Sequence, residues 1–265
     1  MYPYLYELHF HTRYGSACGR SDETDYLPFY QAQGYRGIVV TDHFYHGNTA
    51  PSRDLPWDAY VARYCEGYYR MKDAAKDYGI DIFFGLEENF GGDEYLVLGL
   101  TPAWLTAHPE LRNADRYTFL HLAREAGAFL IQAHPFRERD YIKRITLTPD
   151  FSDAVEVYNC GNDPMCSRRA LEYARAYHLP MTGGSDIHCV PEDPHKAHLS
   201  GIASAVPFAT VQELCEAIAA GQVQVIGAEV LESLPAHTRP TLPAVVLRTK
   251  TDGGFAEPVP YQTEM

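Results

Sequence analysis

The sequence is poor in basic residues relative to acidic ones. Of its 265 residues, 22 are Lys or Arg and 35 are Asp or Glu, which gives a formal net charge of −13. This balance disfavours partners such as nucleic-acid polymers or anionic membranes, whose phosphates attract basic side chains. It does not exclude a small phosphorylated substrate, because bound metal cations can reverse the local charge. We therefore expect no extended nucleic acid and no membrane as a partner. The sequence leaves the oligomeric state open.

Other absences narrow the location and the chemistry. No apolar run approaches the ~20 residues that span a bilayer, and the N-terminal residues lack the basic and apolar regions of a signal peptide. We therefore expect a cytoplasmic protein. The six cysteines form no C-x-x-C pair, which disfavours a zinc knuckle or a thioredoxin-like site. The G-x-S-x-G, P-loop and G-x-G-x-x-G motifs of serine hydrolases, NTPases and Rossmann enzymes are missing as well.

Short apolar runs alternate with longer amphipathic stretches along the chain, a pattern that predicts a parallel α/β sheet. At least seven strand–helix units fit, so we expect one closed or nearly closed barrel domain over residues 1–232. The Pro-rich residues 233–265 would be a C-terminal extension, packed on the barrel or trailing from it. Strands are expected at 4–10, 36–41, 80–86, 95–100, 128–133, 154–158, 179–183, 201–206 and 222–226, and helices at 24–33, 57–78, 117–126, 164–177 and 211–220.

Histidines and carboxylates cluster at the C-terminal ends of the expected strands. In a barrel these ends meet at one rim, where active sites form. His-x-His on a strand places both imidazoles on one face, because side chains alternate. Imidazole and carboxylate ligands together suit Zn, Mn or Fe, and the 12 His of this acidic chain make a metal site the natural expectation. The clusters are His9 with His11, Asp42 with His43, Glu87, His134, Glu156 with Asn159, and Asp186 with His188.

Six segments together resemble the PHP (polymerase and histidinol phosphatase) family of metal-dependent phosphoesterases. They are Glu7-Leu-His-Phe-His-Thr12, Gly37-Ile-Val-Val-Thr-Asp-His43, Gly85-Leu-Glu87, Ala133-His-Pro135, Glu156-Val-Tyr-Asn159 and Gly183-Gly-Ser-Asp-Ile-His188. The resemblance spans residue 4 to about residue 206. It implies a distorted (βα)7 TIM-like barrel with a metal cluster at its C-terminal rim. The metal ligands it implies are His9, His11, His43, Glu87, His134, Asp186 and His188.

The sequence departs from the family pattern at two places. Family members often carry a further carboxylate or His ligand soon after the opening motif, whereas this chain has Ser16-Ala-Cys18-Gly19. Cys18 could replace that ligand, but we expect it to be a buried cysteine without a metal. Many members also carry a His on the strand after the Glu87 motif, where Tyr95 or Leu96 stands here. We therefore expect two divalent metal ions, with three as the alternative.

The resemblance implies hydrolysis of a small phosphomonoester or nucleotide, by attack of a hydroxide that bridges two metal ions. His43 or His188 could donate a proton to the leaving group if it is not fully committed as a ligand. The residues expected to support the ligands or to bind the substrate's phosphate are Asp42, Asn159, Arg13, Arg137 and Lys196.

Two other functions are compatible with these residues. Amidohydrolases, which cleave C–N bonds, also open with H-x-H and place an Asp on a barrel strand. They commonly bridge their metals with a carboxylated lysine at a strand end, and no lysine ends an expected strand here. Glu87 would take the bridging place, which favours phosphoester chemistry. The other alternative is a non-catalytic PHP-type module that binds metal or a partner.

Overall fold

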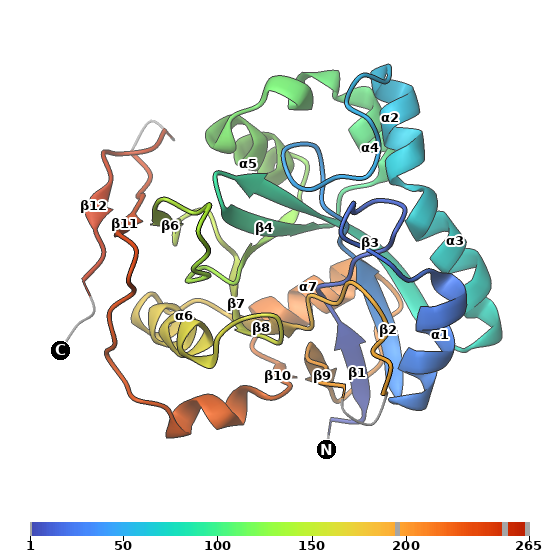
Figure 1. Cartoon of the computed structure of the whole chain (residues 1–265). Helices are drawn as coiled ribbons and strands as arrows, with labels where there is room; N and C mark the ends of the chain where they lie inside the picture. Colours follow the sequence, from blue (N-terminus) through green and yellow to red (C-terminus); the bar gives the residue numbers. More distant parts are fainter. Residues whose placement is uncertain (1, 194–196, 251–253, 263–265) are drawn as a thin grey trace.

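The computed structural model describes residues 2–193, 197–250 and 254–262, and its main feature is a nearly closed sheet with helices around it (Figure 1). Within these residues the sheet has the strand order β10-β9-β1-β2-β3-β4-β5-β7-β8. The strands are β1 (Tyr4–Glu7), β2 (Tyr35–Val40), β3 (Asp81–Phe90), β4 (Asp93–Leu98), β5 (Phe129–Ala133), β7 (Ala154–Asn159), β8 (Met181–Gly184), β9 (Ile202–Ser204) and β10 (Val223–Val225).

The chain segments that follow β1 and β8 pair with each other and nearly close the sheet. Phe10 and Ile187 form a parallel bridge. The His11 amide donates to the Ile187 carbonyl at 3.2 Å, and the Asp186 amide donates to the His9 carbonyl at 2.9 Å. The closure therefore lies at the level of the predicted ligands and fixes two of their segments against each other.

Helices between the strands cover the outside of the sheet, with α1 to α3 along one side and α6 on another (Figure 1). Several begin at a polar cap, as at Asp22, Asp115 and Thr210, whose side chains accept a backbone N–H of the first turn. The helices are α1 (Glu23–Ala32), α2 (Trp57–Tyr64), α3 (Glu66–Ala74), α4 (Pro102–Ala107), α5 (Arg116–Glu125), α6 (Pro164–Ala176) and α7 (Val211–Ala219), with 3₁₀ turns η1 (Ala75–Asp77), η2 (Pro109–Asn113) and η4 (Ala228–Ser233).

The structure corrects the expectation of a regular parallel repeat. β3 and β4 form an antiparallel hairpin with no helix between them, and β4 is also antiparallel to β5. Gly91 and Gly92 make the turn with φ angles of 73° and 99°, a region that glycine enters at little cost. β9 is antiparallel to β1 and to β10. The fold is therefore a mixed, barrel-like sheet rather than a parallel one, and the distorted (βα)7 arrangement implied by the resemblance stays a prediction.

A second correction concerns the long helix expected at 57–78. The chain forms α2, α3 and η1 instead, with Cys65 between the first two at φ −79° and ψ −2°. The apolar stripe survives this break, because Trp57, Tyr60 and Tyr64 remain buried in the core. None of the described helices has the length and apolar character needed to cross a membrane.

The C-terminal residues contain structure that the sequence pattern did not reveal. β11 (Ala244–Val246) pairs in parallel with β6 (Ile145–Leu147) and antiparallel with β12 (Val259–Pro260). This segment runs past α6 toward β6 in Figure 1. Leu231 and Val246 are buried in one apolar cluster with residues of α6. The division of the chain at residue 232 stays a prediction.

The hairpin provides a test of the fold. A Cβ on Gly92 would lie 2.8 Å from Cγ1 of Ile142, whereas a Cβ on Gly91 would meet nothing within 4 Å. Because both residues have positive φ, only the clash distinguishes them. We predict that Gly92→Ala lowers the free energy of unfolding by about 1–3 kcal/mol, and Gly91→Ala by less. Urea denaturation measures both, and equal losses would contradict the hairpin geometry.

Candidate metal centre

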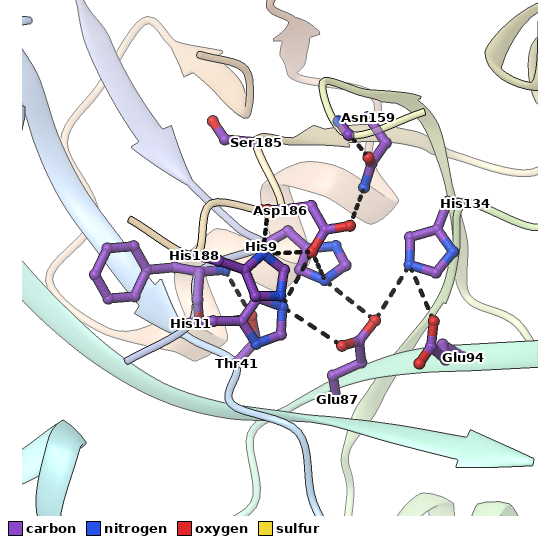
Figure 2. Close-up of polar contacts among 12 residues, drawn as sticks. His9, His11, Thr41, Glu87, Glu94, His134, Asn159, Ser185, Asp186 and His188 are labelled. Carbon is purple, nitrogen blue, oxygen red and sulfur yellow. Dashed lines mark hydrogen bonds and ion pairs between the residues drawn. The ribbon is translucent and has the colours of Figure 1, made fainter. Parts of the chain in front are cut away.

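The seven residues predicted as metal ligands converge at one end of the sheet, around Glu87. Figure 2 labels all of them except His43. The Glu87 carboxylate contacts four imidazoles from three different strand ends, with His11 Nε2 the most distant at 3.5 Å from Oε2. Its Oε1 lies 3.1 Å from His9 Nε2 and 3.2 Å from His134 Nε2, and its Oε2 lies 2.7 Å from His43 Nδ1. A single buried carboxylate therefore joins ligands from β1, β2 and β5.

Asp186 is the second carboxylate of the cluster, on the side away from His134. Its Oδ1 lies 3.2 Å from His11 Nε2, 3.5 Å from His9 Nε2 and 3.7 Å from His188 Nδ1. His9 and His11 reach it together because alternate residues of an extended segment share one face. The imidazoles of His11 and His188 stack with their centroids 4.4 Å apart.

The structure adds Glu94 to the cluster, a residue that the sequence interpretation missed. Its Oε2 lies 3.4 Å from His134 Nε2, and its side chain is buried. Because β4 runs antiparallel to β3, its first residues rather than its last lie at the rim. Tyr95 and Leu96, named from the family pattern, are buried in the apolar core. The signal that could have revealed Glu94 was the Gly91-Gly92 pair, which is typical of a hairpin turn.

The cluster offers overlapping sets of atoms close enough to share a metal ion. In each set the ligand atoms lie within 4.8 Å of one another. The sets share Glu87, His9, His11 and His43, so the cluster is one extended centre with several lobes. The sets are His9, His11 and Asp186; His9, Glu87 and His134; His43, Glu87 and Glu94; and His11, His43 and His188.

Four buried polar atoms at the centre have no hydrogen-bond partner within the part of the chain that the structure describes. They are His9 Nε2, His11 Nε2, His43 Nδ1 and Glu87 Oε2. Leaving such groups unpaired costs ~1–3 kcal/mol each, and buried polar atoms in native proteins nearly always have partners. These atoms face one another, and all are of kinds that bind divalent transition metals. The residues therefore fit a metal cluster.

Hydrogen bonds on the far side of the rings orient three of the histidines. The Nδ1 of His9 lies 2.9 Å from Oε1 of Glu156, and the Nδ1 of His188 lies 2.8 Å from the Asp186 carbonyl oxygen. Both oxygens are acceptors, so each Nδ1 carries a proton, and Nε2 is the nitrogen that would bind a metal ion in place of a second proton. Ser16 Oγ donates to Asp42 and therefore accepts from His11 Nδ1, at 3.0 Å. This arrangement is typical of metal-binding histidines.

Gly184 allows His9 and Glu156 to meet. A Cβ at this position would lie 2.3 Å from both Glu156 Oε1 and His9 Cβ. Any larger residue here would push the His9 ring or its acceptor away. This close approach explains why glycine occupies position 184.

Asp42 acts on the cluster through the loop that follows His11. Its carboxylate accepts the Thr12 amide at 2.6 Å, the Thr12 hydroxyl at 2.7 Å and the Ser16 hydroxyl at 2.7 Å. Ser16 Oγ in turn accepts the His43 amide at 2.9 Å. Burial raises the pKa of Asp42 to about 6, although the Ser16 and Thr12 hydrogen bonds oppose this shift. Asp42 thus holds the loop and, through Ser16, the His43 amide.

The other predicted supporting residues differ in position. Arg137 is largely buried and donates to Asp186 and, at 2.8 Å, to Asn162 Oδ1, with Glu94 Oε2 3.7 Å away. Asn159 Nδ2 donates to Glu156 Oε2 at 3.0 Å. Arg13 instead pairs with Asp22 at 3.2 Å, with half of its side chain exposed. Lys196 lies outside the described residues.

Cys18 lies beside the cluster rather than in the apolar core. It is half-buried, so the expectation of a buried cysteine is wrong in degree. Burial alone would raise the pKa of this thiol, but hydrogen bonding to His188 and His43 lowers the pKa to about 6. That Cys18 binds no metal stays a prediction.

The carboxylates create a field that favours positive charge at the centre. Burial would lower the pKa of His9, but Glu156, Glu87 and Asp186 hold that pKa well above its ordinary value. Glu87 likewise outweighs burial and raises the pKa of His43. Burial lowers the pKa of His11 to about 3, with His43 adding to the effect, so this ring is neutral. Divalent cations would meet the same favourable field.

The buried carboxylates show the complementary shift. Burial would raise the pKa of Glu87, yet His9 and His43 hold it well below its ordinary value. The same holds for the pKa of Asp186, where His9 and Arg137 outweigh burial. Glu94 differs, because burial and the Glu87 charge raise its pKa. A cation between Glu87 and Glu94 would relieve that repulsion.

Two of the cluster residues have unusual backbone angles. His134 has a φ of 27° and Asp186 a φ of 54°, in the left-handed region that few residues other than glycine adopt. The backbone amide of each is held by a hydrogen bond, from His134 to Glu156 Oε2 at 3.0 Å and from Asp186 to the His9 carbonyl at 2.9 Å. Strain of this kind is concentrated at functional sites.

The fold is similar to that of several solved structures at low sequence identity. One is a two-domain protein of Bacteroides vulgatus that is described as containing a predicted PHP-like metal-dependent phosphoesterase. It matches with a TM-score of 0.61 and 18% identity, over 85% of this chain and 67% of that one. PsfC of Pseudomonas syringae matches with a TM-score of 0.52 and 17% identity, over 79% of this chain and 85% of that one.

An amidohydrolase of Chromobacterium violaceum, with bound sulfate and no metal, matches with a TM-score of 0.51 and 17% identity, over 84% of this chain and 99% of that one. No protein-family model matches the chain, and no curated protein matches it in sequence. At these identities the likeness concerns the fold, which is shared by proteins described as phosphoesterases and as an amidohydrolase.

The pKa shifts predict how stability depends on pH when metal is removed. Protonated His9 and His43 are stabilised by Glu87, and this contribution is complete below the unfolded-state pKa of about 6.5. It is lost as the pH rises through their raised folded-state pKa values. Glu87 and Asp186 have the opposite pH dependence. Their contribution to stability is lost as the pH falls through their lowered pKa values.

We therefore predict that the chelator-treated protein loses unfolding free energy as the pH rises above about 6.5 and through the raised folded-state pKa values of His9 and His43. Added Zn²⁺ or Mn²⁺ should remove this loss, because the cations take the place of the protons. Urea denaturation at several pH values, with and without chelator, measures the effect. A metal-free protein whose stability does not change over this range would contradict the assigned ion pairs.

Proposed function

We propose that this chain is a metal-dependent phosphoesterase of the PHP type that hydrolyses a small phosphomonoester or nucleotide. The observation that carries the proposal is the set of unpartnered, buried histidine and carboxylate atoms around Glu87. The similarity in fold to a protein described as containing a predicted PHP-like phosphoesterase supports it further. So do the sequence motifs, because each of their seven candidate ligands belongs to one of the sets around Glu87.

The cluster can hold two ions that share Glu87. One would be bound by His9, His11 and Asp186, and the other by His134 and Glu94. The donor set of imidazole and carboxylate suits Zn, Mn or Fe. Such ions, when bound, activate a water molecule and neutralise the charge that develops on phosphoryl oxygens.

The protein's own residues would orient the substrate. Arg137 brings a guanidinium next to Asp186 and Glu94, where it can hold a phosphoryl oxygen through its N–H groups. The proton-donor role predicted for His43 and His188 requires a ring nitrogen that is free of metal. Burial opposes protonation of His188, but Cys18 and Asp186 raise its pKa. If His43 or His188 binds a metal ion through that nitrogen, it cannot donate a proton to the leaving group.

Hydrolysis of a C–N bond is the second candidate, because the fold is also that of a protein described as an amidohydrolase. A bridging carboxylated lysine has no counterpart at the centre of the described cluster, where Glu87 takes the middle place. A module that binds metal without catalysis is the remaining alternative. All three are separated by one activity screen.

The screen uses phosphorylated metabolites with added Mn²⁺, Zn²⁺ or Fe²⁺ and measures released phosphate. We predict activity for the unmodified chain and a loss of roughly 10³-fold or more for Glu87→Gln, because the shared ligand is lost. His121→Ala is the matched control, since His121 is exposed on α5, away from the cluster, where it pairs with Glu125 and stacks on Tyr117. Bound metal with no phosphate release would refute the phosphoesterase proposal, and a parallel panel of cyclic amides would then test the amidohydrolase.

Arg137 and Arg13 provide a matched pair for substrate binding. Arg137 is buried against the cluster, whereas Arg13 is half-exposed and pairs with Asp22. We predict that Arg137→Lys lowers kcat/KM by roughly 10–100-fold, because lysine lacks the planar fork that holds two oxygens. Arg13→Lys should change kcat/KM by less than about 2-fold. Equal effects of the two substitutions would contradict the role of Arg137.

A further inference from the structure

Three consecutive charged residues in the loop between β5 and β6 reach three different parts of the molecule. Arg137 donates to Asp186 at the metal cluster. Glu138 points the other way, to the C-terminal extension, and Arg139 donates to the Gly161 carbonyl at 3.1 Å. The backbone that carries the Arg137 guanidinium is therefore held from more than one side.

The Glu138 carboxylate joins this loop to α6 and to the C-terminal extension. It accepts the Thr241 amide at 2.8 Å and the Thr241 hydroxyl at 2.5 Å. Arg169 of α6 donates to the same carboxylate at 3.4 Å and also to the Thr238 hydroxyl at 3.2 Å. Hydrogen bonds to an ionised group are stronger than those between neutral groups, so Glu138 is a firm attachment point.

The rest of the loop is largely exposed and depends on a few such attachments. Residues 139–141 and 143–144 are exposed, whereas Ile142 is buried. At the end of the loop, the Ile145 amide donates to the Pro243 carbonyl at 2.9 Å, and β6 then pairs with β11. The extension therefore holds the exposed stretch at both ends, through Thr241 at Glu138 and through Pro243 at Ile145. We call residues 238–246 the strap.

We propose that Glu138 is a positioning residue for Arg137, and that the strap acts through Thr241 to keep the Arg137 guanidinium in place for the substrate's phosphoryl group. The inference rests on the proposed function, in which Arg137 holds a phosphoryl oxygen. A phosphate that takes up N–H groups of Arg137 competes with Asp186 for them. The loop must then keep its place through its own attachments, since a shift of about 1 Å in a binding group can cost about 100-fold in rate.

Inorganic phosphate is the probe, because its binding does not depend on turnover. The full chain, loaded with Mn²⁺, is titrated with phosphate in a calorimeter. Glu138→Ala should weaken phosphate binding by roughly 10-fold, because the Arg137 backbone loses its outer attachment. Thr241→Val, which removes one hydrogen bond, should weaken it by roughly 3–5-fold. Thr241→Ser keeps the hydroxyl and should restore the affinity.

Thr249 provides the matched control, because it makes the same kind of contact elsewhere in the extension. Its amide and its hydroxyl donate to Oδ2 of Asp150, beyond β6, at 2.8 and 3.2 Å. Thr249→Val should lower the midpoint of urea unfolding about as much as Thr241→Val does, yet change phosphate affinity by less than about 2-fold. Equal effects of the two substitutions on phosphate affinity would mean a general loosening of the extension and would overturn the inference.

A double-substitution cycle separates positioning from a merely structural role. In the Arg137→Ala background, Glu138→Ala should change phosphate affinity by less than about 2-fold, because the side chain through which Glu138 acts is already gone. Effects that simply add would show that Glu138 acts independently of Arg137, and the inference would be wrong. Circular dichroism checks that each variant is folded.

The outcomes also separate this inference from the proposed function. Weaker phosphate binding in Glu138→Ala and Thr241→Val that vanishes once Arg137 is removed supports the strap. Unchanged binding in Glu138→Ala overturns the inference, whatever the metabolite screen shows. A chain that binds phosphate in the predicted way but hydrolyses no phosphoester overturns the proposed function alone. A metal-loaded chain that binds no phosphate overturns both.

Discussion

A buried carboxylate surrounded by imidazoles is the constraint on which the rest of this structure depends. Glu87 contacts His9, His43 and His134, each from a different strand end, at 2.7 to 3.2 Å. Without compensation, a buried charge and several unpaired nitrogens would be unfavourable by several kcal/mol. The fold accepts this arrangement only if something positive occupies the centre. Protons do so in the metal-free state, as the shifted pKa values of His9 and Glu87 show, and divalent cations would do so more completely.

The architecture exists to bring these groups together and to hold them. The bridge between Phe10 and Ile187 closes the sheet and places His9 and His11 against Asp186. Behind them, Glu156, Asp42 and Ser16 fix the rings through hydrogen bonds, so that the lone pairs point inward. The left-handed backbone of Asp186 is held by the same network. A site built this way is rigid before any ion or substrate arrives.

Much of this arrangement could be predicted from the sequence, for a simple reason. The ends of parallel strands share one rim, so residues such as His9, His43 and His134 could be placed together without coordinates. That rule fails where a strand runs antiparallel to its neighbours. Glu94 lies on the antiparallel β4, and its place at the rim became visible only with the hairpin at Gly91 and Gly92. Cys18 could not be placed either, because hydrogen bonds to Asn48 and His188 position its loop, and no periodicity encodes them.

The central claim is that Glu87 bridges bound metal ions, and crystals of the unchelated protein test it most directly. Diffraction data collected on both sides of the zinc, iron and manganese absorption edges locate each element by its anomalous signal. The account predicts anomalous peaks on both sides of the Glu87 carboxylate, within bonding distance of its two oxygens, with the histidines of β1 and β5 as further ligands. Clear density for an ordered Glu87 with no anomalous peak beside it would contradict the account.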